Sequence, residues 1–146
     1  SVSGITKAGV IAKQRGTGTV DVYVSNGENS PTAAAVAEAQ KLIAKNRELN
    51  VDVRVAAAQA KRVNMSVVVY AKGGYIRNDI VDICTQVFKD YLNEIEIGGT
   101  MYAAEVGKRL MNSGCIRSYK FATNFIDNSA TAAQVFSAGT VNIEVK

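Results

Sequence analysis

The chain has 146 residues, of which 47% are hydrophobic, and its formal net charge is +4. This composition predicts one ordinary domain, or two small and closely packed ones, with a buried core. The sequence contains no histidine, which removes the usual general base near neutral pH, the usual zinc ligand and any Ser-His or Cys-His pair. No apolar run approaches the roughly 20 residues that span a bilayer, so we expect no membrane segment.

Two further features concern cysteine and the start of the chain. Cys84 and Cys115 lie far from any CxxC spacing and within apolar patterns, so we expect buried, reduced thiols. The chain does not begin with Met, and "SVSGITKAG" lacks the apolar segment of a signal peptide. We therefore expect a processed chain or a fragment of a longer one.

The first part of the sequence predicts the order β-β-α-β. In "VDVYV" the residues Val20, Val22 and Val24 alternate with Asp21 and Tyr23, which is typical of a half-buried strand. The strand "VDVRV" repeats this alternation after an amphipathic helix. The expected elements are strands at residues 5–14, 20–24 and 51–55 and a helix at residues 32–48.

The first helix has clear start signals. Asn26-Gly27 is a turn pair that ends the preceding strand. Ser30 then offers an N-cap, and Pro31 occupies the first helical position, which is the favoured order at a helix start.

The remaining sequence predicts the order β-α-α-β-β. A connection "AAAQA" leads into a strand in which Val63, Met65, Val67 and Val69 share one side, and Gly73-Gly74 ends it. Two helices and two strands follow, with a polar loop at residues 123–139 between the last two strands. The expected elements are strands at residues 61–72, 115–122 and 140–145 and helices at residues 76–95 and 101–112.

Together these patterns predict an α+β fold made of two small tandem α/β units. Each unit is expected to be a small, mostly antiparallel or mixed sheet covered by helices. The first unit covers residues 1–58 and the second covers residues 59–146.

The segment Gly98-Gly99-Thr100 precedes a helix, as phosphate-binding loops do. A phosphate loop, however, follows a strand, whereas here a long helix comes first, and the GxxxxGK[ST] spacing is absent. We therefore expect the glycines to reverse the chain between two helices, Thr100 to cap the second helix, and Gly114 to end it in a left-handed conformation.

Two weaker motifs favour structural interpretations. Gly16 and Gly18 open a strand rather than a helix, so a hairpin entry is favoured over a dinucleotide site. Asp79 and Asp82 lie near a helix start, where acids are favoured by the helix dipole, so a metal pair is the less favoured alternative. We expect no catalytic residues, no metal and no cofactor.

The second unit carries several basic residues that form a candidate partner contact. If they converged on one face, Tyr70, Tyr75 and Tyr119 could stack bases beside them, which leaves a small α/β nucleic-acid-binding domain as the alternative. No aromatic-rich strand motif of the RNA-recognition type is present, however. A rim for an acidic protein partner is favoured, and the candidate residues are Lys61, Arg62, Lys108, Arg109, Arg117 and Lys120.

The order of these segments resembles the baseplate J-like family, the baseplate wedge proteins of contractile-tailed phages and phage-like tail particles. The resemblance runs over the whole chain and corresponds to the carboxy-terminal portion of such a protein. The family usually has prolines around "NVDVRV" and "MNSGCIR", whereas this chain has only Pro31. The segments that carry the resemblance are "RGTGTVDVYV", "VDVRV", "VNMSVVVY", "YLNEIEIGGTMYAAEVGKRLMNSGCIRSYKF" and "GTVNIEV".

The resemblance implies a structural, non-enzymatic role in a virion tail baseplate that is assembled in the bacterial host cytoplasm. The implied partners are other baseplate and tail proteins and copies of the chain itself, without nucleic acid, membrane or a small-molecule substrate. The strands "VDVYV" and "VNIEV" are expected to be sheet edges that a partner strand can extend.

Overall fold

The computed structural model describes residues 7–12, 19–25, 33–46 and 52–146. Signals for turns and helix starts at Gly16, Gly18, Asn26-Gly27, Ser30 and Pro31 lie outside these residues. The described part confirms the α+β fold class.

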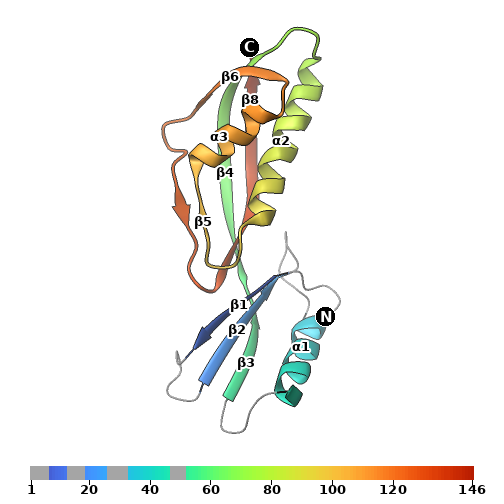
Figure 1. The fold of residues 1–146 in the computed structure, drawn as a ribbon, viewed down its shortest axis with the longest axis vertical. Coiled ribbons are helices and arrows are strands. Elements are labelled where there is room, and N and C mark those ends of the chain that lie inside the picture. The colour runs from blue at the N-terminus through green and yellow to red at the C-terminus, as the bar shows by residue number, and fades with distance from the viewer. Residues whose placement is uncertain (1–6, 13–18, 26–32, 47–51) are drawn as a thin grey trace. The chain divides into compact units, whose positions relative to one another are not determined.

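The chain divides into two compact units (Figure 1). The prediction assigned each unit one continuous segment with a boundary after residue 58. In the structure, the long continuous part of the first unit ends at Lys61, and two later segments return to that unit. The first unit comprises Ser1–Lys61, Glu96–Gly99 and Ala130–Val135, and the second comprises Arg62–Ile95, Thr100–Ser129 and Phe136–Lys146.

The first unit has the predicted element order β-β-α-β. Its sheet has the strand order β1-β2-β3, with β1 antiparallel to β2 and β2 parallel to β3. The parallel pair requires a crossover connection, which contains α1. The elements are β1 (Lys7–Ala12), β2 (Thr19–Ser25), α1 (Ala33–Asn46) and β3 (Asp52–Ala57).

The core of the first unit lies between its sheet and α1. Val22 and Val24 of β2, Val55 of β3 and Ala39 of α1 form one buried apolar cluster. This is the side of β2 that the alternation predicted to be buried.

The opposite side of β2 is also covered. Asp21 is only 7% exposed, and Gly9 of β1, which lies opposite Tyr23, closely approaches the Ile97 side chain. Ile97 belongs to a segment that returns from far along the chain. The sequence pattern of β2 alone carries no sign of this second cover.

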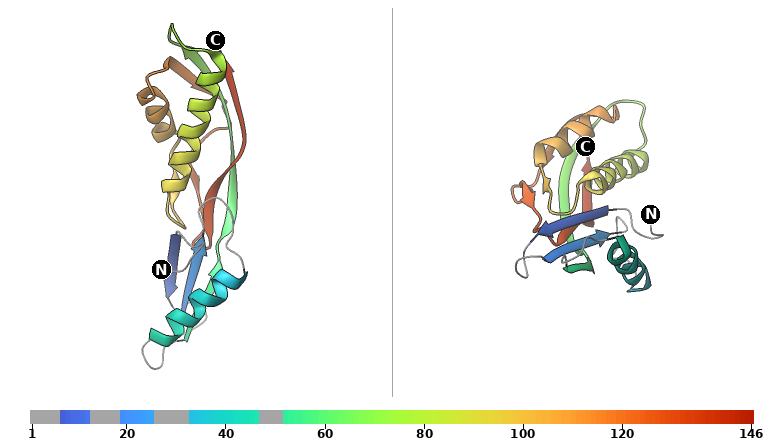
Figure 2. Two further views of the ribbon diagram at one scale, coloured as in Figure 1. Left: turned by 90° about the vertical axis from the view of Figure 1, so that its right-hand side faces the viewer. Right: turned by 60° about the horizontal axis from the view of Figure 1, so that its bottom comes forward.

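The second unit is a sheet with both helices on one side (Figures 1 and 2). The strand order is β6-β4-β8, and β4 is antiparallel to β6. β8 lies along the other side of β4, where the Lys146 N–H donates to the Val69 carbonyl and the Ala71 N–H donates to the Lys146 carbonyl. The elements are β4 (Gln59–Ala71), α2 (Arg77–Glu94), β5 (Thr100–Met101), α3 (Ala103–Asn112), β6 (Ile116–Phe121), β7 (Asn128–Ser129) and β8 (Gln134–Val145).

Alternate side chains of β4 supply the core of this unit, as the period-two pattern predicted. Val63, Met65, Val67 and Val69 are all buried. The helices contribute their apolar stripes, whose buried members are Ile80, Cys84, Phe88, Tyr91 and Leu92 of α2 and Val106, Gly107 and Leu110 of α3.

Three expectations about the second unit were wrong because distant segments supply backbone partners. β4 begins at Gln59, inside the predicted connection, since the Gln59 N–H donates to the Ala133 carbonyl. β8 begins at Gln134, inside the predicted loop, and Val135 and Phe136 are buried. β5 and β7 form an additional two-stranded sheet that the sequence did not predict.

Candidate interaction surfaces

The Gly98-Gly99 segment is a structural corner. The Gly98 N–H donates to the Gln134 carbonyl, and the Gly99 N–H donates to the Glu96 carbonyl. Both amides are therefore already used by the backbone, whereas an anion-binding loop needs them free. The positive φ of Gly98, 79°, supports the prediction that glycine reverses the chain here.

The predicted capping role of Thr100 is wrong. Thr100 lies in β5, and its hydroxyl is 3.1 Å from the Ser129 hydroxyl of β7. The N-cap of α3 is Tyr102, which has no side-chain capping bond. The Ala103 N–H donates instead to Oδ1 of Asp127 at 2.8 Å, so a carboxylate 24 residues away in sequence caps the helix.

The C-terminal end of α3 follows the prediction. Gly114 has a φ of 79°, and its N–H donates to the Met111 carbonyl. A left-handed glycine therefore ends the helix.

The six predicted contact residues come from several elements. Lys61 and Arg62 lie on β4, in different units, and the Arg62 guanidinium donates to the Ala138 carbonyl. Lys108 and Arg109 lie on α3, and Arg117 and Lys120 lie on β6. Arg62, Lys108, Arg117 and Lys120 are exposed.

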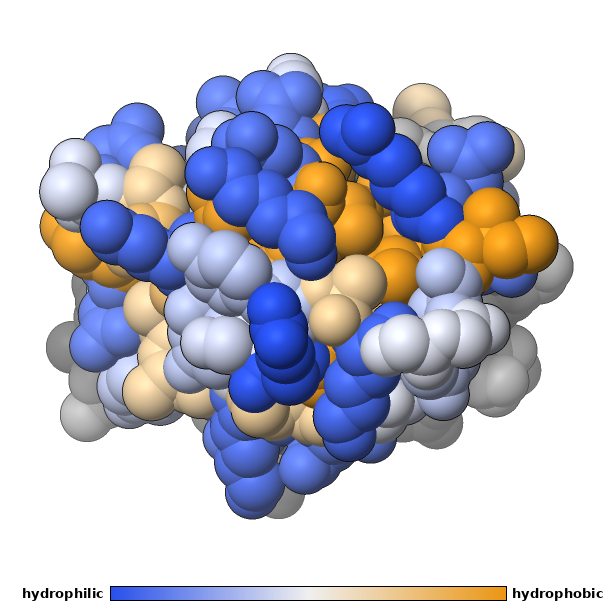
Figure 3. All heavy atoms as spheres, turned by 90° about the horizontal axis from the view of Figure 1, so that it is seen from above, coloured by the Kyte–Doolittle hydropathy of each residue, from blue (hydrophilic) through white to orange (hydrophobic). Residues whose placement is uncertain are grey.

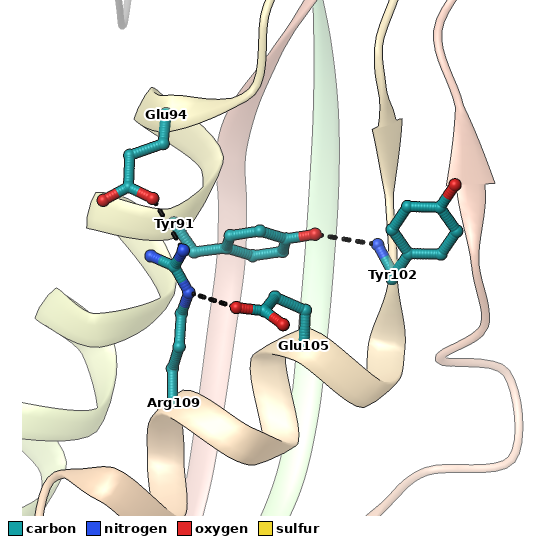
Figure 4. A network of polar contacts seen from close by, with 5 residues as sticks. All are labelled: Tyr91, Glu94, Tyr102, Glu105 and Arg109. Atoms are coloured by element: carbon teal, nitrogen blue, oxygen red, sulfur yellow. Dashed lines mark hydrogen bonds and ion pairs between the residues drawn. The ribbon is translucent and has the colours of Figure 1, made fainter.

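Arg109 is engaged within the second unit (Figure 4). Its guanidinium lies 2.7 Å from Glu94 of α2 and 3.0 Å from Glu105 of α3. It also lies over the ring of Tyr91, 4.7 Å from the ring centre, which is a cation–π geometry. The side chain is 31% exposed, so Arg109 mainly ties α3 to α2.

Tyr91 extends this network to the start of α3. Its hydroxyl accepts a hydrogen bond from the Tyr102 N–H at 3.0 Å. Arg109 lowers the pKa of Glu94, first through their hydrogen bond and then through its charge. The same carboxylates raise the pKa of Arg109, so the pair stays charged near neutral pH.

Lys120 lies at a hollow on the sheet of the second unit. The hollow has a volume of about 620 Å³ and is lined by β4, β6 and β8. Three cationic residues line it together with one carboxylate: Arg77, Lys120 and Lys146 with Glu144. The hollow is therefore a mixed but mainly basic surface.

The two cysteines are buried and free, as predicted. Burial raises the pKa of the Cys84 thiol to about 12, and the neighbouring Cys115 adds to the shift. The Cys115 sulfur is 3.2 Å from the Ser113 hydroxyl.

One of the two predicted sheet edges is an edge. "VNIEV" lies in β8, at the end of the order β6-β4-β8. "VDVYV" lies in β2, which β1 and β3 flank on both sides, so that prediction is wrong. Its backbone groups are occupied by ladder bonds and cannot accept a partner strand.

An exposed apolar segment between β4 and α2 was not predicted. Tyr75 is 47% exposed and Ile76 is 67% exposed. Figure 3, seen from the top of Figure 1, shows apolar side chains among hydrophilic ones on that surface. No sequence signal marks the exposure of Ile76, because its position four residues before Ile80 places it on the apolar stripe of a helix that would include it.

None of the described helices has the length and apolar composition of a membrane-spanning segment.

A protein-family model, the Baseplate J-like central domain, matches residues 1–57 of the sequence. This match covers most of the continuous part of the first unit and leaves the second unit outside it. No curated protein matches the chain. Over residues 1–57 the chain is therefore similar to the central domain of the baseplate J-like family.

Proposed function

We propose that the chain is a structural part of a contractile-tail baseplate and acts through protein–protein contacts between wedge subunits. The match of residues 1–57 to the baseplate J-like central domain carries this proposal. The second unit would supply further contact surfaces, and two candidates among the described residues are the edge of β8 and the exposed segment before α2.

We further propose that the role is non-enzymatic and that assembly takes place in the bacterial host cytoplasm. The absence of histidine from the sequence supports the first point. So does the pairing of Arg109 with Glu94 and Glu105, since these charged groups hold helices together.

The direct test is co-production of the chain with the other tail proteins of the phage or prophage that encodes it. The proposal expects the chain to elute with at least one of them in size-exclusion chromatography and to retain that complex after purification. Elution as a separate species from every tail protein would contradict the proposal.

The purified chain also allows a test of the alternative function, nucleic-acid binding. Exposed Lys108, Arg117 and Lys120 favour it, whereas the pairing of Arg109 and the position of Glu144 in the basic hollow oppose it. Binding to duplex or single-stranded DNA that weakens steeply with added salt would support this alternative. Our proposal expects no measurable binding at low salt.

A further inference from the structure

The segment that connects β4 to α2, residues 72–76, presents apolar side chains to solvent. Tyr75 and Ile76 are 47% and 67% exposed. A Cβ atom added at Gly73 or Gly74 would meet no atom within 4 Å, so the segment is open on this side as well. The packing of the second unit does not account for these two side chains.

Isoleucine is also an unfavourable residue at the N-cap position that Ile76 occupies. It is the N-cap of α2, with φ −82° and ψ 140°, and no side chain caps the helix there. Ser, Thr, Asp and Asn are preferred at this position because their side chains accept a hydrogen bond from the first turn, which isoleucine cannot do. A residue that suits neither the helix start nor solvent is expected where function sets the choice.

Cationic residues flank the apolar pair in sequence. Lys72 and Arg77 flank it in sequence, both are exposed, and neither forms an ion pair with any residue that the structure describes. Lys146 lies beside the end of β4, since its carbonyl accepts from the Ala71 N–H at 2.9 Å. The first carboxylate of α2 is that of Asp79.

We propose that Tyr75 and Ile76 form the anchor of a protein–protein contact and dock into an apolar pocket whose rim carries carboxylates. An exposed aromatic residue beside an aliphatic one, bordered by charge, has the composition of an interface hot spot. The proposed function is used only to identify the partner as another tail protein. The chemistry of the pocket follows from the segment itself.

A protein pocket fits this segment better than a lipid surface does. Two side chains bury too little apolar area to hold a protein on a bilayer, where even a single myristoyl chain binds only marginally. Two well-packed side chains are enough for a protein hot spot, because a few buried residues carry most of the binding energy of an interface.

The test compares two serine substitutions in the full chain. Ile76→Ser removes the anchor and also supplies a good N-cap, so its midpoint of thermal unfolding should rise by a few degrees. Ile126→Ser is the matched control, because Ile126 is also 67% exposed but lies between β6 and β7. Each variant is titrated against each of the other tail proteins, purified individually, by biolayer interferometry.

We expect one tail protein to bind the wild-type chain and the Ile126→Ser variant equally. Its Kd for Ile76→Ser should be about thirtyfold higher, the value typical of a hot-spot residue. Tyr75→Ser should weaken the same complex, and Lys72→Glu with Arg77→Glu should slow its association.

Each other outcome has a defined meaning. Equal binding by wild-type and Ile76→Ser chains overturns this inference and leaves the proposed function intact. Failure of every tail protein to bind the wild-type chain overturns both. If Ile76→Ser instead abolishes binding to vesicles of anionic phospholipid, or self-association in sedimentation, the proposed protein pocket is wrong.

Discussion

Arg109 links the two helices of the second unit through ion pairs and an aromatic ring. Arg109 was expected to belong to a surface contact, because charged residues on a helix are normally solvated. Its actual partners come from α2 and α3, and the contact with Glu94 joins residues that periodicity cannot bring together. The sequence therefore identifies Arg109 as a charged residue, but it does not show that the side chain joins α3 to α2.

Replacing Arg109 tests this network. Arg109→Met should lower the free energy of unfolding at neutral pH, whereas Lys108→Met, which removes an exposed cation on the same helix, should have almost no effect. Because Glu94 has a lowered pKa in the folded state, the contribution of the pair is present above the unfolded value of about 4.3. This contribution is lost as the pH falls through the lower pKa that Glu94 has in the folded protein.

The measurement is urea unfolding of both variants from neutral to acidic pH. The difference in free energy of unfolding between wild type and Arg109→Met should become smaller once the pH falls below about 4. A difference that stays constant to strongly acidic pH would show that the ion pair is not its source.

The Cys84 thiol gives a prediction at alkaline pH. Its pKa is raised to about 12 in the folded state by burial and by Cys115, against about 8.5 for an unfolded cysteine. The folded protein holds this proton more tightly, so the contribution to stability is complete below about pH 8.5 and is lost as the pH rises through the folded value. In that window stability should fall by up to about 1.4 kcal/mol per pH unit.

Unfolding with a reductant present, measured at several pH values above 8, checks this slope. Cys84→Ala should show a shallower decrease than wild type, because the variant lacks the shifted group. Parallel decreases in the two proteins would contradict the burial of a neutral thiol.

At the scale of elements, periodicity predicted which stretches become helices and strands, and tertiary contacts decided where they begin. The buried residues of β4, α2 and α3 follow from spacing alone. The early start of β4, the early start of β8 and the β5–β7 pair depend on partners from distant parts of the chain. No local pattern contains that information.

The contact between α3 and β6 depends on Gly107. A Cβ atom there would overlap the ring and hydroxyl of Tyr119. Alanine favours a helix by about 1 kcal/mol over glycine, but overpacking costs about 1–3 kcal/mol. We therefore expect Gly107→Ala to lower the free energy of unfolding. The double variant with Gly107→Ala and Tyr119→Ala should lose less free energy of unfolding than the sum of the losses of the two single variants.

Chemical denaturation of the four proteins in this double-mutant cycle checks the overlap. Gly73→Ala is the control, because a Cβ atom there meets nothing. A stabilising Gly107→Ala substitution would show that α3 and β6 are not in close contact at this position.

The start of α3 gives a second comparison. Asp127→Ala removes the carboxylate that accepts from the Ala103 N–H and should cost about 1 kcal/mol, as loss of a helix cap does. Thr100→Ala removes only an exposed hydroxyl pair with Ser129 and should cost less. Thermal unfolding ranks the two variants, and a larger loss for Thr100→Ala would restore the predicted threonine cap.

For the whole molecule, the order of segments in the sequence was enough to indicate the resemblance to the baseplate J-like family. It was not enough to identify the contact surfaces. The family match rests on residues 1–57, where the alternating strands are easily recognised. The six predicted contact residues lie on β4, α3 and β6, and Arg109 is paired with Glu94, so their joint use in a partner contact stays a prediction. The exposed pair Tyr75 and Ile76 was overlooked because exposure is a property of packing rather than of sequence.

The proposed function makes the chain a resident part of the tail baseplate. The most direct measurement is immunogold electron microscopy of tail particles purified from the host, with an antibody raised against this chain. The proposed function predicts label at the baseplate end of the tail. Particles without label, from lysates in which the chain is present and free, would contradict it.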